Sequence, residues 1–159
     1  MQRDPAIAEL LNEVLTAELT SVNQYFVDYK MLDNWGYGPL AQHYRDESID
    51  EMKDADELIG RILFLEGEPN LQRLATVRVG ETVPEKLQLA LDLEYESIER
   101  LNLGIAKCLE LGDNGSRALL AQILEGEEEH ADWLETQLGL VSQLGENNYL
   151  AQQLRSDDD

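Results

Sequence analysis

The chain has 159 residues, enough for one domain with a substantial core. Its 12 Lys and Arg residues against 33 Asp and Glu residues give a net charge of −21. Such a charge attracts cations and argues against nucleic acid or an anionic membrane as a partner. A need for solubility alone also accounts for it. No apolar run approaches the ~20 residues of a membrane span, and no segment resembles a signal peptide. Because the single Cys108 cannot form an internal disulfide, we expect a cytoplasmic protein.

Helix start and stop signals predict two long helices in the first half of the chain. Asp4 followed by Pro5 is typical of a helix N-terminus, and the first helix is expected to run to about Asn34. The Gly- and Pro-containing turn at 35–39 ends it. A second helix is then expected to run to about Glu66.

The second half begins with a long connection, 67–83, which contains Pro and Gly. A capping-box pattern, Thr82 with Glu85 three residues later, predicts the start of a third helix. This helix is expected to end at 111–112, where a glycine follows a leucine.

A fourth helix is expected at about 116–144 and a short fifth at about 147–154, before an acidic tail at 155–159. Two short turns and one long central connection predict an all-α, ferritin-like four-helix bundle with one crossover. We interpret 1–159 as a single domain with the bundle at about 4–144.

Each of the four core stripes, read at helical spacing, contains a glutamate near its middle, namely Glu18, Glu51, Glu94 and Glu127. Four buried carboxylates that converge without partners would be very costly, so the pattern indicates bound cations. His130 lies three residues after Glu127 and shares its helix face. Carboxylates with an imidazole suit iron or manganese, with zinc as an alternative.

The spacing of these residues indicates an internal repeat of two helical hairpins. Glu18 and Glu51 are 51 − 18 = 33 residues apart, and Glu94 and Glu127 are 127 − 94 = 33 residues apart. Each hairpin therefore brings one lone glutamate and one Glu-x-x-ligand motif to the same level. The pattern is close to that of di-iron helical bundles.

Several longer motifs carry a family resemblance: LTSVNQYF at 19–26, ESIDEM at 47–52, RILFLE at 61–66 with PNL at 69–71, DWLET at 132–136 and NYL at 148–150. Over nearly its whole length the sequence resembles the bacterioferritins. The resemblance implies a shell of twenty-four subunits that oxidises Fe(II) at a di-iron centre within each subunit, with two iron ions per subunit, and stores ferric mineral inside. It further implies a ferredoxin-type electron donor for iron release.

The resemblance also implies a b-type haem, one per subunit pair, between two-fold-related subunits. Met52 matches the axial ligand, and Leu19, Asn23 and Phe26 match the haem pocket. Spacing alone favours ordinary dimer packing for Met52, which shares an apolar edge with Ile49, Ile59 and Leu63.

Asp54 stands where the family usually has a second histidine. With it, the di-iron ligands would be Glu18, Glu51, Asp54, Glu94, Glu127 and His130. Direct ligation by Asp54 is sterically plausible, but it would add a fifth negative charge where four already neutralise two ferrous ions. Two alternatives are an impaired centre, in a subunit that mainly supplies haem sites to a mixed shell with a second subunit type, and a side chain that simply faces water.

Four further residues carry weaker expectations. Tyr25 and Trp133 lie near the level of the glutamates and are either electron donors or core aromatics. We expect His43 at the surface and Cys108 in the core.

Three other readings are less favoured. A DNA-protecting mini-ferritin would have a basic tail, whereas this tail is acidic, and its ligands would lie at a subunit interface. A rubrerythrin-type peroxidase would commonly carry a Cys-x-x-Cys module, which this chain lacks. A purely structural bundle leaves the four aligned glutamates unexplained.

Overall fold

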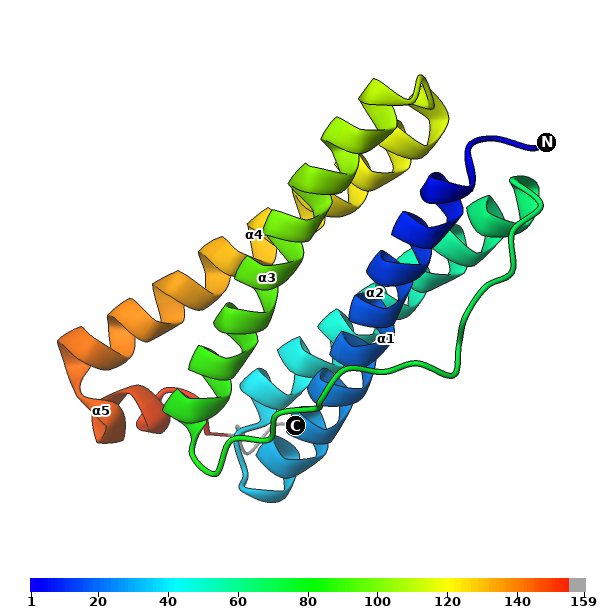
Figure 1. Ribbon diagram of the computed structural model, residues 1–159. Helices are drawn as coiled ribbons and strands as arrows, with labels where there is room; N and C mark the ends of the chain where they lie inside the picture. Colours follow the sequence, from blue (N-terminus) through cyan, green and yellow to red (C-terminus); the bar gives the residue numbers. More distant parts are fainter. Residues whose placement is uncertain (155–159) are drawn as a thin grey trace.

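The computed structural model describes residues 1–154 and is all-helical over that range, with the four-helix bundle and short fifth helix that the sequence predicts (Figure 1). The helices are α1 (Pro5–Asn34), α2 (Gly38–Phe64), α3 (Val83–Glu110), α4 (Asn114–Leu144) and α5 (Glu146–Ala151). The expected acidic tail at 155–159 lies outside the described residues.

The helix ends follow from capping side chains. The Asp4 carboxylate accepts a hydrogen bond from the Ala6 backbone N–H, and the Thr82 hydroxyl accepts one from the Glu85 N–H at 3.2 Å, as expected. α4 begins at Asn114, two residues before the predicted start, because Asp113 is its N-cap and accepts a hydrogen bond from the Ser116 N–H at 3.0 Å.

The bundle consists of two helical hairpins, α1 with α2 and α3 with α4, each packed mainly within itself (Figure 1). The long crossover after α2 returns along the outside of α1, so α3 runs parallel to α2 and antiparallel to α1. The second hairpin therefore repeats the first in reversed orientation.

A polar stripe on α1 holds this crossover in place. Its members stand at every fourth position, so they share one helix face. The bonds join Asn70 N–H to Asn12 (2.8 Å), Arg73 Nε to Thr16 (3.2 Å), Ala75 N–H to Thr20 (3.0 Å) and Arg78 N–H to Gln24 (3.1 Å). The stripe satisfies donors of a segment without regular secondary structure.

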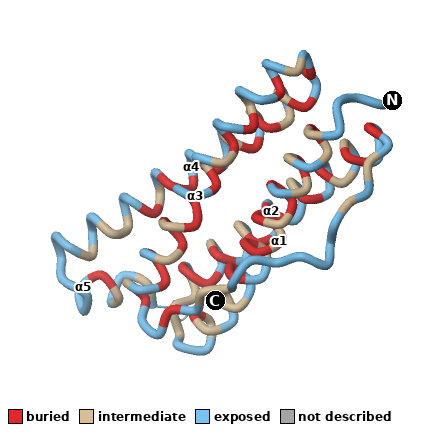
Figure 2. The backbone as a smooth tube through the Cα atoms, viewed as in Figure 1, coloured by how far each residue is buried: buried red, intermediate tan, exposed pale blue. Residues whose placement is uncertain are grey.

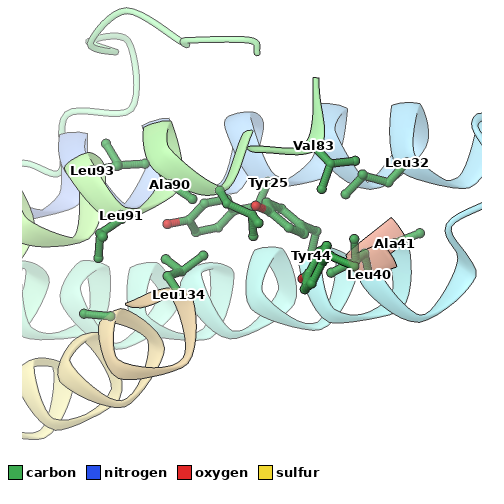
Figure 3. Packing of buried hydrophobic residues seen from close by; sticks show 13 residues of the cluster. Tyr25, Leu32, Leu40, Ala41, Tyr44, Val83, Ala90, Leu91, Leu93 and Leu134 are labelled. Carbon is green, nitrogen blue, oxygen red and sulfur yellow. The ribbon is translucent and has the colours of Figure 1, made fainter. Parts of the chain in front are cut away.

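Buried residues line the facing sides of the four helices (Figure 2). The apolar residues among them form two clusters. One cluster, near α5, includes Tyr25, Tyr44 and Leu134 (Figure 3). The other, toward the opposite end, includes Leu11 and Leu58 and contains Cys108, which confirms its expected place in the core. Between the clusters lies a layer of buried carboxylates. None of the described helices is apolar over a stretch sufficient to cross a bilayer.

Candidate metal centre

The four glutamates at mid-helix form the polar layer between the two apolar clusters. Glu18 on α1, Glu51 on α2, Glu94 on α3 and Glu127 on α4 are all buried, none with more than 3% of its surface exposed. The apolar residues that flank each of them along its helix fix their inward direction. One oxygen of each carboxylate, Oε2, is buried without a hydrogen-bond partner among the described residues.

Three of these glutamates meet Asp54. One ligand atom each of Glu18, Glu51, Asp54 and Glu127 lies within 4.8 Å of all the others. Asp54 is half-buried, and it lies one turn after Glu51 on the same face of α2. The structure therefore places Asp54 with the carboxylate cluster and not on an open solvent face.

Crowding and burial shift the acid–base behaviour of the cluster. Burial raises the pKa of Glu18 well above its usual value, and the neighbouring charge of Glu127 raises it further. Burial likewise raises the pKa of Glu51 and that of Glu127, followed by the charge of Glu18 in the first case and of Glu94 in the second. Burial also raises the pKa of Asp54 to about 7, with repulsion from Glu57 next. Without a cation the carboxyl groups of the cluster therefore hold their protons to a higher pH than exposed carboxyl groups do.

Glu94 connects the cluster to a tyrosine and a histidine. The buried Tyr25 hydroxyl donates a hydrogen bond to Glu94 Oε1, and His130 Nδ1 lies 2.9 Å from the same oxygen. Burial raises the pKa of Glu94 to about 7, against the lowering effect of its hydrogen bonds. Tyr25 thus touches a predicted ligand, in addition to packing in the core.

His130 also faces a residue that the sequence did not single out as a ligand. Its Nδ1 lies 3.4 Å from Glu47 Oε2, and its ring stands edge-on to Tyr25. Burial lowers the pKa of His130, so the imidazole is neutral at neutral pH. Glu47 stands four residues before Glu51, a spacing that could have identified it.

The expectation that His43 is a surface residue is wrong. Its ring is half-buried and stacks on Trp133, with ring centroids 3.4 Å apart and planes 13° apart. Burial lowers its pKa to about 4. Sequence reading missed this position because the stack joins α2 to α4, and no spacing within one helix reveals it.

A cavity of about 480 Å³ between α2 and α4 reaches the centre. Carboxylates and imidazoles dominate its wall, including Glu51, Asp54, Glu127 and His130. This cavity gives an ion from outside the bundle a route lined by ligands.

Met52 lies outside this site, on the outer surface of α2. It is 49% exposed and lines a shallow, mainly apolar pocket with Ile49 and Ile59. On α1, Phe26 is 53% exposed, Asn23 is exposed and Leu19 is half-buried. The outer surface of the first hairpin thus exposes large apolar side chains, a pattern that indicates a contact surface for another molecule.

Comparisons with known proteins agree on the family. Residues 8–144 match the model of the ferritin-like domain. The chain is 51% identical over 152 residues to the "Bacterioferritin BfrA" of Mycobacterium tuberculosis and to the bacterioferritin of Mycobacterium leprae, covering 96% of both chains in each comparison. It is 49% identical over 151 residues to a bacterioferritin of Streptomyces coelicolor, covering 95% of this chain and 90% of the relative.

Proposed function

The chain belongs to the bacterioferritin family of iron-storage proteins, and from this we propose that it oxidises Fe(II) at a di-iron centre in the polar layer. The product would be stored as ferric mineral inside a shell of twenty-four subunits in the cytoplasm, and haem would bind at two-fold contacts. The observation that carries the proposal is the buried carboxylate layer, in which each of the four glutamates keeps one oxygen without a hydrogen-bond partner in residues 1–154.

The residues of this layer fit two iron ions. Glu18, Glu51 and Asp54 would offer ligands to one ion, and Glu94 and His130 would offer ligands to the other. Glu127 lies within 4.8 Å of the first three and would serve as a ligand between the two positions. Unpaired buried oxygens are costly unless a cation or a proton meets them, and ferrous iron accepts this mixture of carboxylate and imidazole. Iron bound there would supply the electrons that reduce oxygen or peroxide.

Side chains of the protein would donate and accept the protons and electrons that the reaction at the iron requires. Ion binding requires the carboxyls to release protons, because burial raises their pKa values. Tyr25, in contact with Glu94, is placed to donate a proton or an electron near the His130 side. Trp133 is the second proposed electron donor, through its stack with His43.

Asp54 supports a second candidate function. If its extra charge weakens one iron position, the subunit would serve mainly as the haem-binding member of a mixed shell. The observation in favour is the position of Asp54 in the carboxylate cluster, where it brings a further negative charge within 4.8 Å of Glu18, Glu51 and Glu127.

Haem would bind at Met52. A thioether is an established haem ligand, and the apolar pocket of Ile49 and Ile59 offers half of a haem site. The other axial methionine would come from Met52 of a second copy. Leu19, Asn23 and Phe26 of α1 would flank the haem, and a small ferredoxin would deliver electrons for iron release.

Assembly is tested first, because a shell is required for storage. Sedimentation velocity of the purified protein should show one large, hollow species. A stable monomer under native conditions at every salt concentration would contradict the proposal.

The di-iron centre is tested with a buried glutamate and its exposed neighbour. Anaerobic Fe(II) titration of the wild type should reach two ions per chain, followed by rapid oxidation when oxygen is admitted. Glu127→Gln removes a predicted ligand and should lower the oxidation rate at least tenfold. Glu128→Gln changes the next, exposed residue in the same way and should leave the rate unchanged. Equal rates in the two variants would refute the centre.

A further inference from the structure

A second group of ligand atoms lies beside the carboxylate cluster. One ligand atom each of His43, Glu47 and His130 lies within 4.8 Å of the other two. All three residues line the cavity between α2 and α4. His43 and Glu47 stand one turn apart on α2, and His130 comes from α4, so the group bridges the two hairpins.

The two imidazoles of this group have unused nitrogens. His130 is 97% buried, and its Nε2 has no hydrogen-bond partner among the described residues. His43 Nε2 also lacks a hydrogen-bond partner there and lies 3.9 Å from Glu47 Oε1. A buried nitrogen without a partner costs free energy, which a bound cation would recover.

The group is also held in place. His43 lies flat against Trp133, so its ring cannot turn freely. The His43 and His130 ring centroids are 5.2 Å apart. Around a tetrahedral ion with bonds of about 2.0–2.1 Å, ligand atoms stand roughly 3.4 Å apart. The ligand atoms of the group lie within 4.8 Å of one another, so they would have to approach by at most about 1.4 Å (4.8 − 3.4) to close around an ion.

We propose that His43, Glu47 and His130 form a third metal position beside the carboxylate layer, which an ion can occupy as an alternative to the position at Glu94 and His130. Two imidazoles and one carboxylate are a ligand set for borderline transition-metal dications such as Zn²⁺, Co²⁺ and Fe²⁺, in preference to Mg²⁺ or Ca²⁺. The cavity leaves room for water as a fourth ligand.

This position would share His130 with the carboxylate layer. His130 Nδ1 lies 2.9 Å from Glu94 on one side and 3.4 Å from Glu47 on the other. An ion held by His43 and Glu47 therefore competes for His130 with an ion held by Glu94.

The test uses Zn²⁺, which is redox-inert and visible by anomalous scattering. Crystals of the metal-free protein are soaked in Zn²⁺, and binding is titrated in solution. The wild type should show an anomalous peak within about 2.0–2.2 Å of ligand atoms of His43, Glu47 and His130. His43→Gln and Glu47→Gln should each abolish this peak and lower the affinity for one ion at least tenfold in the titration. The ions of the carboxylate layer should remain in both variants.

Asp46→Asn is the matched control for Glu47→Gln, because it removes the same charge from the adjacent, exposed residue. It should keep every peak. The proposal is overturned if no peak appears at the His43 group, if His43→Gln keeps it, or if the ion contacts His43 and Glu47 without His130. If the wild type shows the peak at His43 but no ions in the carboxylate layer, the result would instead count against the proposed di-iron centre.

Discussion

Lys86 of α3 and Asp28 of α1 form an ion pair in the interior, with Nζ 2.9 Å from Oδ1 and both side chains at most 1% exposed. The Lys86 ammonium also lies 3.3 Å from the Met31 sulfur and over the Trp35 ring. The pair joins the two hairpins near the end of the bundle where the crossover meets α3.

Removing one member of this pair should destabilise the fold strongly. Lys86→Met leaves Asp28 buried without its partner and should cost about 3–5 kcal/mol of unfolding free energy, measured by urea unfolding at fixed protein concentration. Lys107→Met, which breaks an exposed pair with Glu110, should cost less than about 1 kcal/mol. Adding Asp28→Leu to Lys86→Met should recover most of the loss. A small loss in Lys86→Met would show that the pair contributes little.

The same carboxyl should make stability depend on pH. Burial raises the pKa of Asp28 from its usual 3.8 to about 6, so the folded state holds this proton more tightly than the unfolded state. The contribution of the protonated Asp28 carboxyl to the free energy of unfolding is therefore complete below about pH 4 and is lost as the pH rises through 6.

Asp28→Asn removes this titration. The unfolding free energy of the wild type minus that of Asp28→Asn should fall by about 1.5 kcal/mol between pH 5 and pH 8. A difference that is flat or rises over this range would mean that Lys86 stabilises the charged carboxylate more than burial destabilises it.

Met52→Leu should abolish haem binding without dissociating the shell. Leucine preserves the approximate volume but removes the sulfur ligand. The wild type should show a low-spin absorption spectrum at up to one haem per subunit pair. Met31→Leu, the same change at a half-buried position away from this pocket, should leave the spectrum unaltered. Full haem retention in Met52→Leu would exclude Met52 as the ligand.

Asp54→His should raise the initial rate of Fe(II) oxidation. The imidazole removes the surplus negative charge and supplies a neutral donor, as His130 does on the other side. The change should be tenfold or more, and the difference in occupancy between the two iron positions should narrow in anaerobic iron soaks. Asp132→His, the same substitution at an exposed position, should not alter the rate. If Asp54→His also leaves rate and occupancy unchanged, the proposed weakness of that position is wrong.

Helical periodicity predicted the bundle and the inward direction of its glutamates because both depend on short-range spacing. One stripe per helix is enough to place Glu18 or Glu94 in a core. The roles of these residues as iron ligands remain predictions, since the structure establishes their proximity only.

Contacts between helices could not be predicted, because they do not depend on spacing within one helix. Lys86 and Asp28 are 58 residues apart, and each alone resembles an ordinary charged residue on a helix. The stack of His43 on Trp133 depends on the rotation of α2 relative to α4. Periodicity within one helix contains no information about that rotation.

The reversed repeat of the two hairpins has a consequence for the metal layer. Equivalent positions are separated by 94 − 18 = 76 residues, which pairs Asp54 with His130. The same offset pairs Tyr25 with Leu101, His43 with Leu119 and Glu47 with Ile123. Three polar neighbours of His130, namely Tyr25, His43 and Glu47, thus have aliphatic counterparts in the other half of the repeat, whereas Glu94 pairs with Glu18. Even with histidine at position 54, the two iron positions would therefore differ chemically, because the residues that surround the ligands differ between the two halves.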